Sequence, residues 1–174
     1  GPQVSDNLKW NGVLAVIVGL LGTIVYISLR FEWRFALSAA IALIHDPILI
    51  LGVFSFWHIE FDMIALVAVL TVIGYSLNDT VVVFDRIREN SIVYKTMNFT
   101  DMINKSLNDT LSRTVITSIT TLFVVTVLFI FGGEVLKGFA FALVIGIILG
   151  TYSSLFVASA LVVELQKRAM ASKS

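Results

Sequence analysis

An ionisable residue, Asp79, stands inside an apolar stretch of this sequence, six residues before Asp85. A charge is expensive in hydrocarbon, so such a residue in a lipid-embedded segment usually marks an ion pathway or a proton relay. Burial raises the pKa of a carboxyl and a nearby cation lowers it, and a carboxyl balanced between the two can bind and release a proton. Asp79 is therefore a candidate proton-binding residue. The alternative is a structural carboxyl that reaches the interface or caps a neighbouring group.

Polar side chains extend this site along two predicted helices. Ser76 lies three residues before Asp79 and shares its helix face. In a later run, Arg113, Thr117 and Thr121 recur every four residues and form a hydrophilic stripe. Such a stripe has no use against lipid, so we expect it to face other helices or a water-filled path. By position alone, Arg113 is better explained as an anchor at the membrane interface, and it is the hydroxyl stripe that favours a functional role.

Asp46 is the deepest charge by counting, 12 residues after Arg34 and 10 before Phe56. Pro47 follows it and lacks a backbone donor, which predicts a kink. His45 is adjacent in sequence but points about 100° away around a helix. Asp46 and His45 are candidates for a second proton relay or for structural hydrogen bonding, and the sequence leaves both open.

The last apolar run carries a small residue at every fourth position. Small residues let membrane helices approach closely. This pattern predicts a packing face that includes Gly146 and Gly150, and it is compatible with a sliding seam or with static packing. The residues are Gly138, Ala142, Gly146, Gly150, Ser154 and Ala158.

Five long apolar runs must position these residues. The chain has 174 residues, of which 57% are hydrophobic and 14% are charged, against about 25% charged in a soluble domain. About 20 apolar residues cross the hydrocarbon core as a helix. We therefore predict an all-α, polytopic membrane protein with a bundle of five transmembrane helices. The predicted order is a periplasmic lead-in (1–12), three transmembrane helices (13–84), a cytoplasmic amphipathic loop (85–110), two transmembrane helices (111–164) and a cytoplasmic tail (165–174).

The basic residues predict the orientation, because they favour the cytoplasmic side. Nine of the flanking basic residues fall on one predicted side and two, Lys9 and Lys137, on the other. The N-terminus is therefore predicted to lie outside and the C-terminus in the cytoplasm. An N-out start without a signal segment suggests a further transmembrane helix upstream. In the 85–110 segment we expect one or two short interfacial helices, one of them capped at Thr100 or Asp101, with a flexible loop as the alternative.

Composition and motifs exclude several classes of function. The formal net charge is zero, so nothing indicates a nucleic-acid partner, and two His without Cys argue against a zinc or disulfide framework. There is no P-loop, zincin helix or nucleophile elbow. We therefore expect no enzymatic site, no metal and no cofactor, and an ion gradient as the source of any energy used.

Three internal segments resemble the SecF family of bacterial protein-export membrane subunits. They are Gly74–Glu89 (GYSLNDTVVVFDRIRE), Ser106–Ser118 (SLNDTLSRTVITS) and Ala42–Asp46 (ALIHD). Gly1–Ser5 resembles the junction before the family's second helix. The similarity covers essentially the whole chain.

The resemblance implies six helices in the family, of which this chain would hold the second to the sixth, in the bacterial cytoplasmic membrane. It implies half of an RND-like transmembrane domain, with SecD as the other half. The partners would be the SecYEG channel, a translocating preprotein and protons of the proton-motive force. Asp79 matches the family's proton-binding Asp, Arg113 its switchable partner, and Asp46 a further family motif. The alternatives are an assembly subunit without proton coupling and a small-molecule RND-type antiporter.

Overall fold

The structure, a computed structural model, describes residues 2–60 and 62–173, and within them the side chains other than those of 2–5, 8 and 173. The described residues form helices joined by short turns, with no strand among them. Five helices are long and apolar enough to cross a membrane, which confirms the predicted all-α polytopic bundle. In chain order the elements are α1 (Pro2–Arg30), α2 (Trp33–Phe56), α3 (Met63–Val93), α4 (Phe99–Phe131), α5 (Gly133–Tyr152), the π-helical η1 (Ser153–Ala158) and α6 (Ser159–Lys173).

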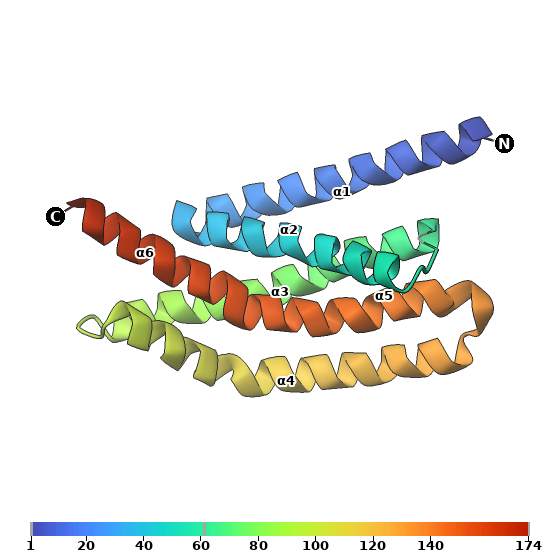
Figure 1. The fold of residues 1–174 in the computed structure, drawn as a ribbon. Coiled ribbons are helices and arrows are strands. Elements are labelled where there is room, and N and C mark those ends of the chain that lie inside the picture. Colours follow the sequence, from blue (N-terminus) through green and yellow to red (C-terminus); the bar gives the residue numbers. More distant parts are fainter. Residues whose placement is uncertain (1, 61, 174) are drawn as a thin grey trace.

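The helices run back and forth along one direction, and the two ends of the chain lie at opposite ends of the bundle (Figure 1). Helix α5 continues through η1 into α6. Helix α5 and η1 pack along α3, whereas α6 packs against α2 and α4. Helices α1 and α4 lie at the two edges in Figure 1. Only 11% of the most apolar window of each is buried, against 44–50% for the other three spans. The outer faces of α1 and α4 are therefore open to lipid or to another protein.

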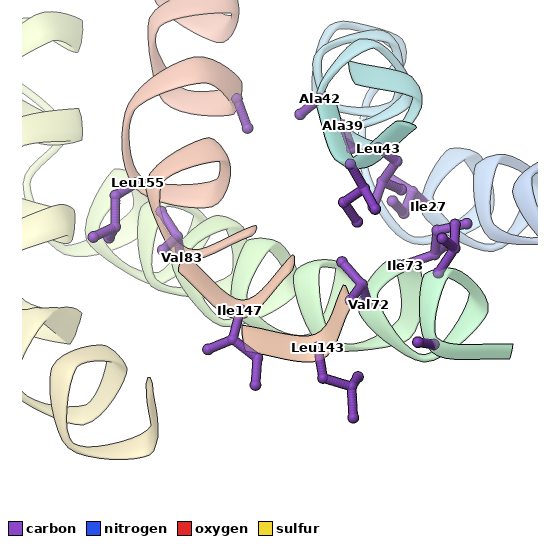
Figure 2. Close-up of a cluster of buried hydrophobic side chains, with 14 of the residues drawn as sticks. Ile27, Ala39, Ala42, Leu43, Val72, Ile73, Val83, Leu143, Ile147 and Leu155 are labelled. Atoms are coloured by element: carbon purple, nitrogen blue, oxygen red, sulfur yellow. The ribbon is translucent and has the colours of Figure 1, made fainter. Parts of the chain in front are cut away.

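Small and β-branched side chains fill the centre of the bundle (Figure 2). Ala39, Ala42 and Leu43 of α2 are buried in the same cluster as Val72 and Ile73 of α3. Their small volume lets the backbones come close, so the helices gain dispersion contacts along their whole length.

Two glycines of α5 lie in close contact with α3. A Cβ added at Gly146 would lie 2.1 Å from Val72 Cγ2, and one added at Gly150 would lie 3.4 Å from Ser76 Cβ. The remainder of the small-residue stripe is also buried, except Gly138, which is half-buried. The structure thus places Gly146 and Gly150 in a close helix–helix contact.

The 85–110 segment differs from the expectation of separate interfacial helices. Helix α3 continues to Val93, and α4 begins at Phe99, so only five residues connect them. The Asn90 side chain donates to Ser106 Oγ at 2.9 Å and to Asp109 Oδ2 at 3.2 Å. These bonds hold the C-terminal part of α3 against the N-terminal part of α4. They also provide the buried Asn90 amide with the partners that a buried polar group needs.

Helix ends also differ in detail from the predictions. The N-cap of α4 is Asn98, whose side chain accepts from the Thr100 backbone N–H at 2.9 Å, so the predicted cap at Thr100 or Asp101 is wrong by two to three residues. Helix α1 already includes the described part of the predicted lead-in. Helix α2 is assigned without interruption across Pro47, and the kink there stays a prediction.

Candidate functional site

Asp79 lies on the buried side of α3 and is only 4% exposed. Its Oδ2 atom has no hydrogen-bond partner among the described residues. A buried carboxylate oxygen without a partner is costly, since it loses its water and gains nothing in return. Binding a proton removes the charge and with it most of that cost. The environment of Asp79 therefore suits a group that exchanges a proton.

Arg113 of α4 interacts electrostatically with the Asp79 carboxylate. The two side chains do not form an ion pair within 4.0 Å, and Arg113 is exposed. Instead its side chain lines a cavity of about 400 Å³ together with Asp85, Glu89 and Asp109. The predicted partners thus interact electrostatically without forming an ion pair, and the carboxylates of the cavity are themselves paired with other basic residues.

Asp46 of α2 is completely buried and lies against α3 and η1. The hydroxyls of Ser76 and Ser153 lie beside its carboxylate. Even so, Asp46 Oδ2 and the Ser76 hydroxyl lack a hydrogen-bond partner of ordinary geometry among the described residues. His45 Nδ1 lies 3.2 Å from Asp46 Oδ1, and the His45 side chain is 30% exposed. The pair therefore connects a buried carboxyl with a partly accessible imidazole.

A chain of hydroxyls joins α3 to the π-helical segment. Thr80 Oγ1 donates to Ser154 Oγ at 3.0 Å, and Ser154 Oγ donates to the Ser76 carbonyl at 3.0 Å. Short π-helical segments occur frequently at functional sites. Ser153 was not predicted as a site residue, and Ser154 was predicted only as a packing residue. The adjacent serines in the last apolar run were the sequence feature that could have indicated a polar site there.

A second hydroxyl chain links three helices. Tyr75 of α3 lies 3.1 Å (Oη to Oγ) from Ser118 of α4, which lies 2.7 Å (Oγ to Oγ1) from Thr151 of α5. Thr117 and Thr121 are half-buried, and neither makes a side-chain hydrogen bond to another helix in the described part of the chain. The predicted stripe of Arg113, Thr117 and Thr121 therefore lies beside the face of α4 that forms hydrogen bonds to α3 and α5. Ser118 occupies that face because one residue turns a helix by about 100°.

Replacing Ser154 by alanine should destabilise the bundle. The substitution removes two buried hydrogen bonds and leaves the Thr80 hydroxyl without its acceptor. Hydrogen bonds between membrane helices contribute about 0.6 kcal/mol each on average, so we expect a loss of about 1 kcal/mol and a lower melting temperature. Thermal unfolding in detergent would measure it. The control is Ser28→Ala, an exposed serine that bonds only within its own helix, and equal melting temperatures for the two variants would contradict the expectation.

Metal-binding clusters are not found among the described residues: no group of three or more His, Cys, Asp or Glu side chains is placed to hold an ion. The candidate site consists of two buried carboxyls, several buried or half-buried hydroxyls and one exposed arginine.

Comparison with known proteins agrees with this architecture. Residues 1–168 match the family model for the protein export membrane protein SecD/SecF, C-terminal. The chain is 55% identical to the protein translocase subunit SecF of Rhodothermus marinus, over 98% of this chain and 58% of that protein. It is also 55% identical to SecF of Vibrio alginolyticus, over 95% of this chain and 52% of that protein.

The fold has a close counterpart among solved structures. The crystal structure of SecDF, a translocon-associated membrane protein from Thermus thermophilus, superposes with a TM-score of 0.92 at 44% identity, over 96% of this chain and 23% of that one. The chain spans about half the length of the SecF relatives it matches. A family match over nearly the whole chain, with high identity and the same fold, leads to one conclusion: the chain belongs to the SecD/SecF family of protein export membrane proteins.

Proposed function

We propose that this chain is the membrane part of a SecF-type subunit that uses the proton-motive force to assist preprotein translocation. The observation that carries the proposal is the buried Asp79 carboxylate, which has an oxygen without a partner among the described residues and interacts electrostatically with Arg113 without forming an ion pair. The SecF relatives are named protein translocase subunits, which supports the export role.

The proposed mechanism is a proton-controlled attraction. Ionised Asp79 attracts Arg113, and a proton at Asp79 Oδ2 removes the attraction and frees the guanidinium. Two unit charges 4 Å apart attract by about 4 kcal/mol at an effective dielectric constant of about 20, less their desolvation cost. The membrane potential contributes about 2.3 kcal/mol per charge per 100 mV. Because these energies are similar, a proton crossing the membrane can switch the pair and move α4 relative to α3.

The membrane location and the protein partners of the chain are part of the same proposal. We place the chain in the bacterial cytoplasmic membrane with its N-terminal end periplasmic and its C-terminal end cytoplasmic. SecD would cover one of the exposed faces of α1 and α4, and the complex would act with the SecYEG channel on the preprotein. Asp46, His45, Ser76 and the Tyr75–Ser118–Thr151 hydroxyls are proposed to support proton movement near Asp79.

Removing the proton gradient should remove the contribution of this subunit to export. Preprotein translocation is measured in membrane vesicles that contain SecYEG and SecD, with and without a complete SecF subunit that carries this chain. Each sample is assayed with and without an uncoupler, and ATP is kept constant. We expect the additional export due to the subunit to disappear with the uncoupler, because the switch then has no driving force.

An assembly role is the competing function, and the exposed faces of α1 and α4 favour it because they offer surface for a partner. If the subunit increases export equally with and without the uncoupler, the assembly role is correct and proton coupling by this chain is wrong. A small-molecule antiporter would instead show substrate-dependent proton uptake without any preprotein.

A further inference from the structure

A basic cavity lies at the end of the bundle where α1 ends and α2 begins. Its volume is about 340 Å³, and α1, α2, α3 and α6 contribute to its wall. Three arginines line it, Arg30, Arg34 and Arg88, together with one carboxylate, Glu32. No role in proton movement requires these residues, and the Asp79 site does not include them.

Two of the three arginines are not neutralised by an ion pair. Arg30 is paired with Asp85, with 2.7 Å between Nη2 and Oδ2. Arg88 lies over the Phe31 ring at 5.9 Å and, like Arg34, has no carboxylate within 4.0 Å among the described residues. The cavity therefore carries an excess of positive charge that the protein itself leaves uncompensated.

Arg34 presents a buried donor that lacks an acceptor. Its Nη1 group donates to Gln166 Oε1 of α6, which holds the guanidinium in place. Its Nε atom is buried and has no hydrogen-bond partner in the part of the chain that the structure describes. A buried N–H without an acceptor is costly, and a phosphate oxygen is among the strongest acceptors for a guanidinium. The guanidinium groups of Arg34 and Arg88, which line the cavity without a carboxylate partner among the described residues, thus suit an anionic ligand with oxygen acceptors.

The surroundings of the cavity are those of a membrane interface. Tyr26 and Trp33 are exposed beside it, and Leu29 is 85% exposed. Exposed Trp and Tyr side chains are typical at the level of the lipid head groups. Basic pockets between transmembrane helices bind the head groups of anionic lipids. We propose that this cavity binds the phosphate of an anionic phospholipid through Arg34 and Arg88, with the acyl chains lying against Leu29 and Trp33.

Lipid retention by the intact chain tests the site without reference to export. The chain is purified with equal amounts of phosphatidylglycerol and phosphatidylcholine, and native mass spectrometry measures the lipid that stays bound. We expect phosphatidylglycerol to be retained in preference. Arg34→Gln and Arg88→Gln should each reduce that preference about fivefold, which corresponds to about 1 kcal/mol for one basic residue near an anionic lipid.

The matched control is Arg168→Gln. It removes one arginine of α6 at the same end of the bundle as the cavity (Figure 1). Its side chain is 77% exposed and lies outside the cavity. Retention should be unchanged in this variant, and circular dichroism confirms that each variant is helical. A wild-type preference in the Arg34→Gln/Arg88→Gln double variant, or an equal loss in Arg168→Gln, would overturn the proposal.

A measurement on the unmodified chain separates the lipid from free phosphate. Short-chain phosphatidylglycerol should raise the melting temperature, whereas short-chain phosphatidylcholine and inorganic phosphate at the same concentration should not. An equal increase with inorganic phosphate would assign the cavity to the free ion and reject the lipid. No increase with phosphatidylglycerol would also reject it, even if the variants failed to fold.

Discussion

An Asp79→Asn substitution in a complete SecF subunit that carries this chain should abolish the proton-driven part of preprotein export. Asparagine has nearly the shape of the protonated carboxyl, so the buried site keeps its packing. It carries no charge and accepts no proton, so Arg113 is never attracted and the proposed switch stays in one state. We expect export in vesicles to fall to the level measured with an uncoupler, and the uncoupler to have no further effect.

The same variant should still assemble. Co-purification with SecD is measured in parallel, and it should be unchanged because Asp79 is buried within this chain rather than on its outer faces. Asp101→Asn is the matched control, since that carboxylate is exposed in the first turn of α4, and its export should equal that of the wild type. Normal export by Asp79→Asn would disprove the proton role, and loss of SecD binding would favour the assembly function.

A Gly146→Ala substitution should destabilise the bundle strongly. The added Cβ would lie 2.1 Å from Val72 Cγ2, 2.9 Å from Cγ1 and 3.0 Å from Cβ. Val72 is β-branched and only 1% exposed, so no rotation of its side chain can clear the contact. Helices α3 and α5 must separate, and overpacking of this kind costs about 1–3 kcal/mol. Thermal or denaturant unfolding in detergent would measure the loss.

Two further variants isolate the cause of that loss. A Cβ added at Gly74, in the middle of α3, meets no atom within 4 Å, so Gly74→Ala should be neutral or stabilising by up to about 1 kcal/mol through helix propensity. Val72→Ala removes both Cγ atoms and should restore part of the stability in the double variant with Gly146→Ala. A similar melting temperature for Gly146→Ala and Gly74→Ala would show that the helix contact is looser than the structure indicates.

The existence of the five helices was predictable because hydrocarbon allows few alternatives. A run of about 20 apolar residues can satisfy its backbone in lipid only as a helix or in a closed barrel. Helix ends were less predictable. Helix α3 extends through polar residues to Val93, where Asn90 finds partners on α4. The sequence shows such polar residues but not that a second helix lies beside them.

The candidate site also contains a part that was predictable from sequence and a part that was not. Asp79 was recognisable from its type and place alone, because a carboxyl in an apolar run has few explanations. Its surroundings were not, because they come from other segments. The hydroxyl beside Tyr75 belongs to Ser118 rather than to Thr117 or Thr121, since the rotation of α4 about its axis depends on packing against α3 and α5.

The helical, membrane-spanning character of the chain and the costly position of one carboxylate could both be predicted from the amino-acid sequence, because both follow from local hydrophobicity. Three features became visible only in the folded chain: Asp79 and Arg113 interact without an ion pair, Asp46 lies against Ser76 and a π-helical segment, and three arginines share a cavity. These features depend on the relative rotation and depth of several helices. The rotation and depth of each helix depend on packing between segments that are distant in sequence, so they cannot be predicted from a local sequence pattern.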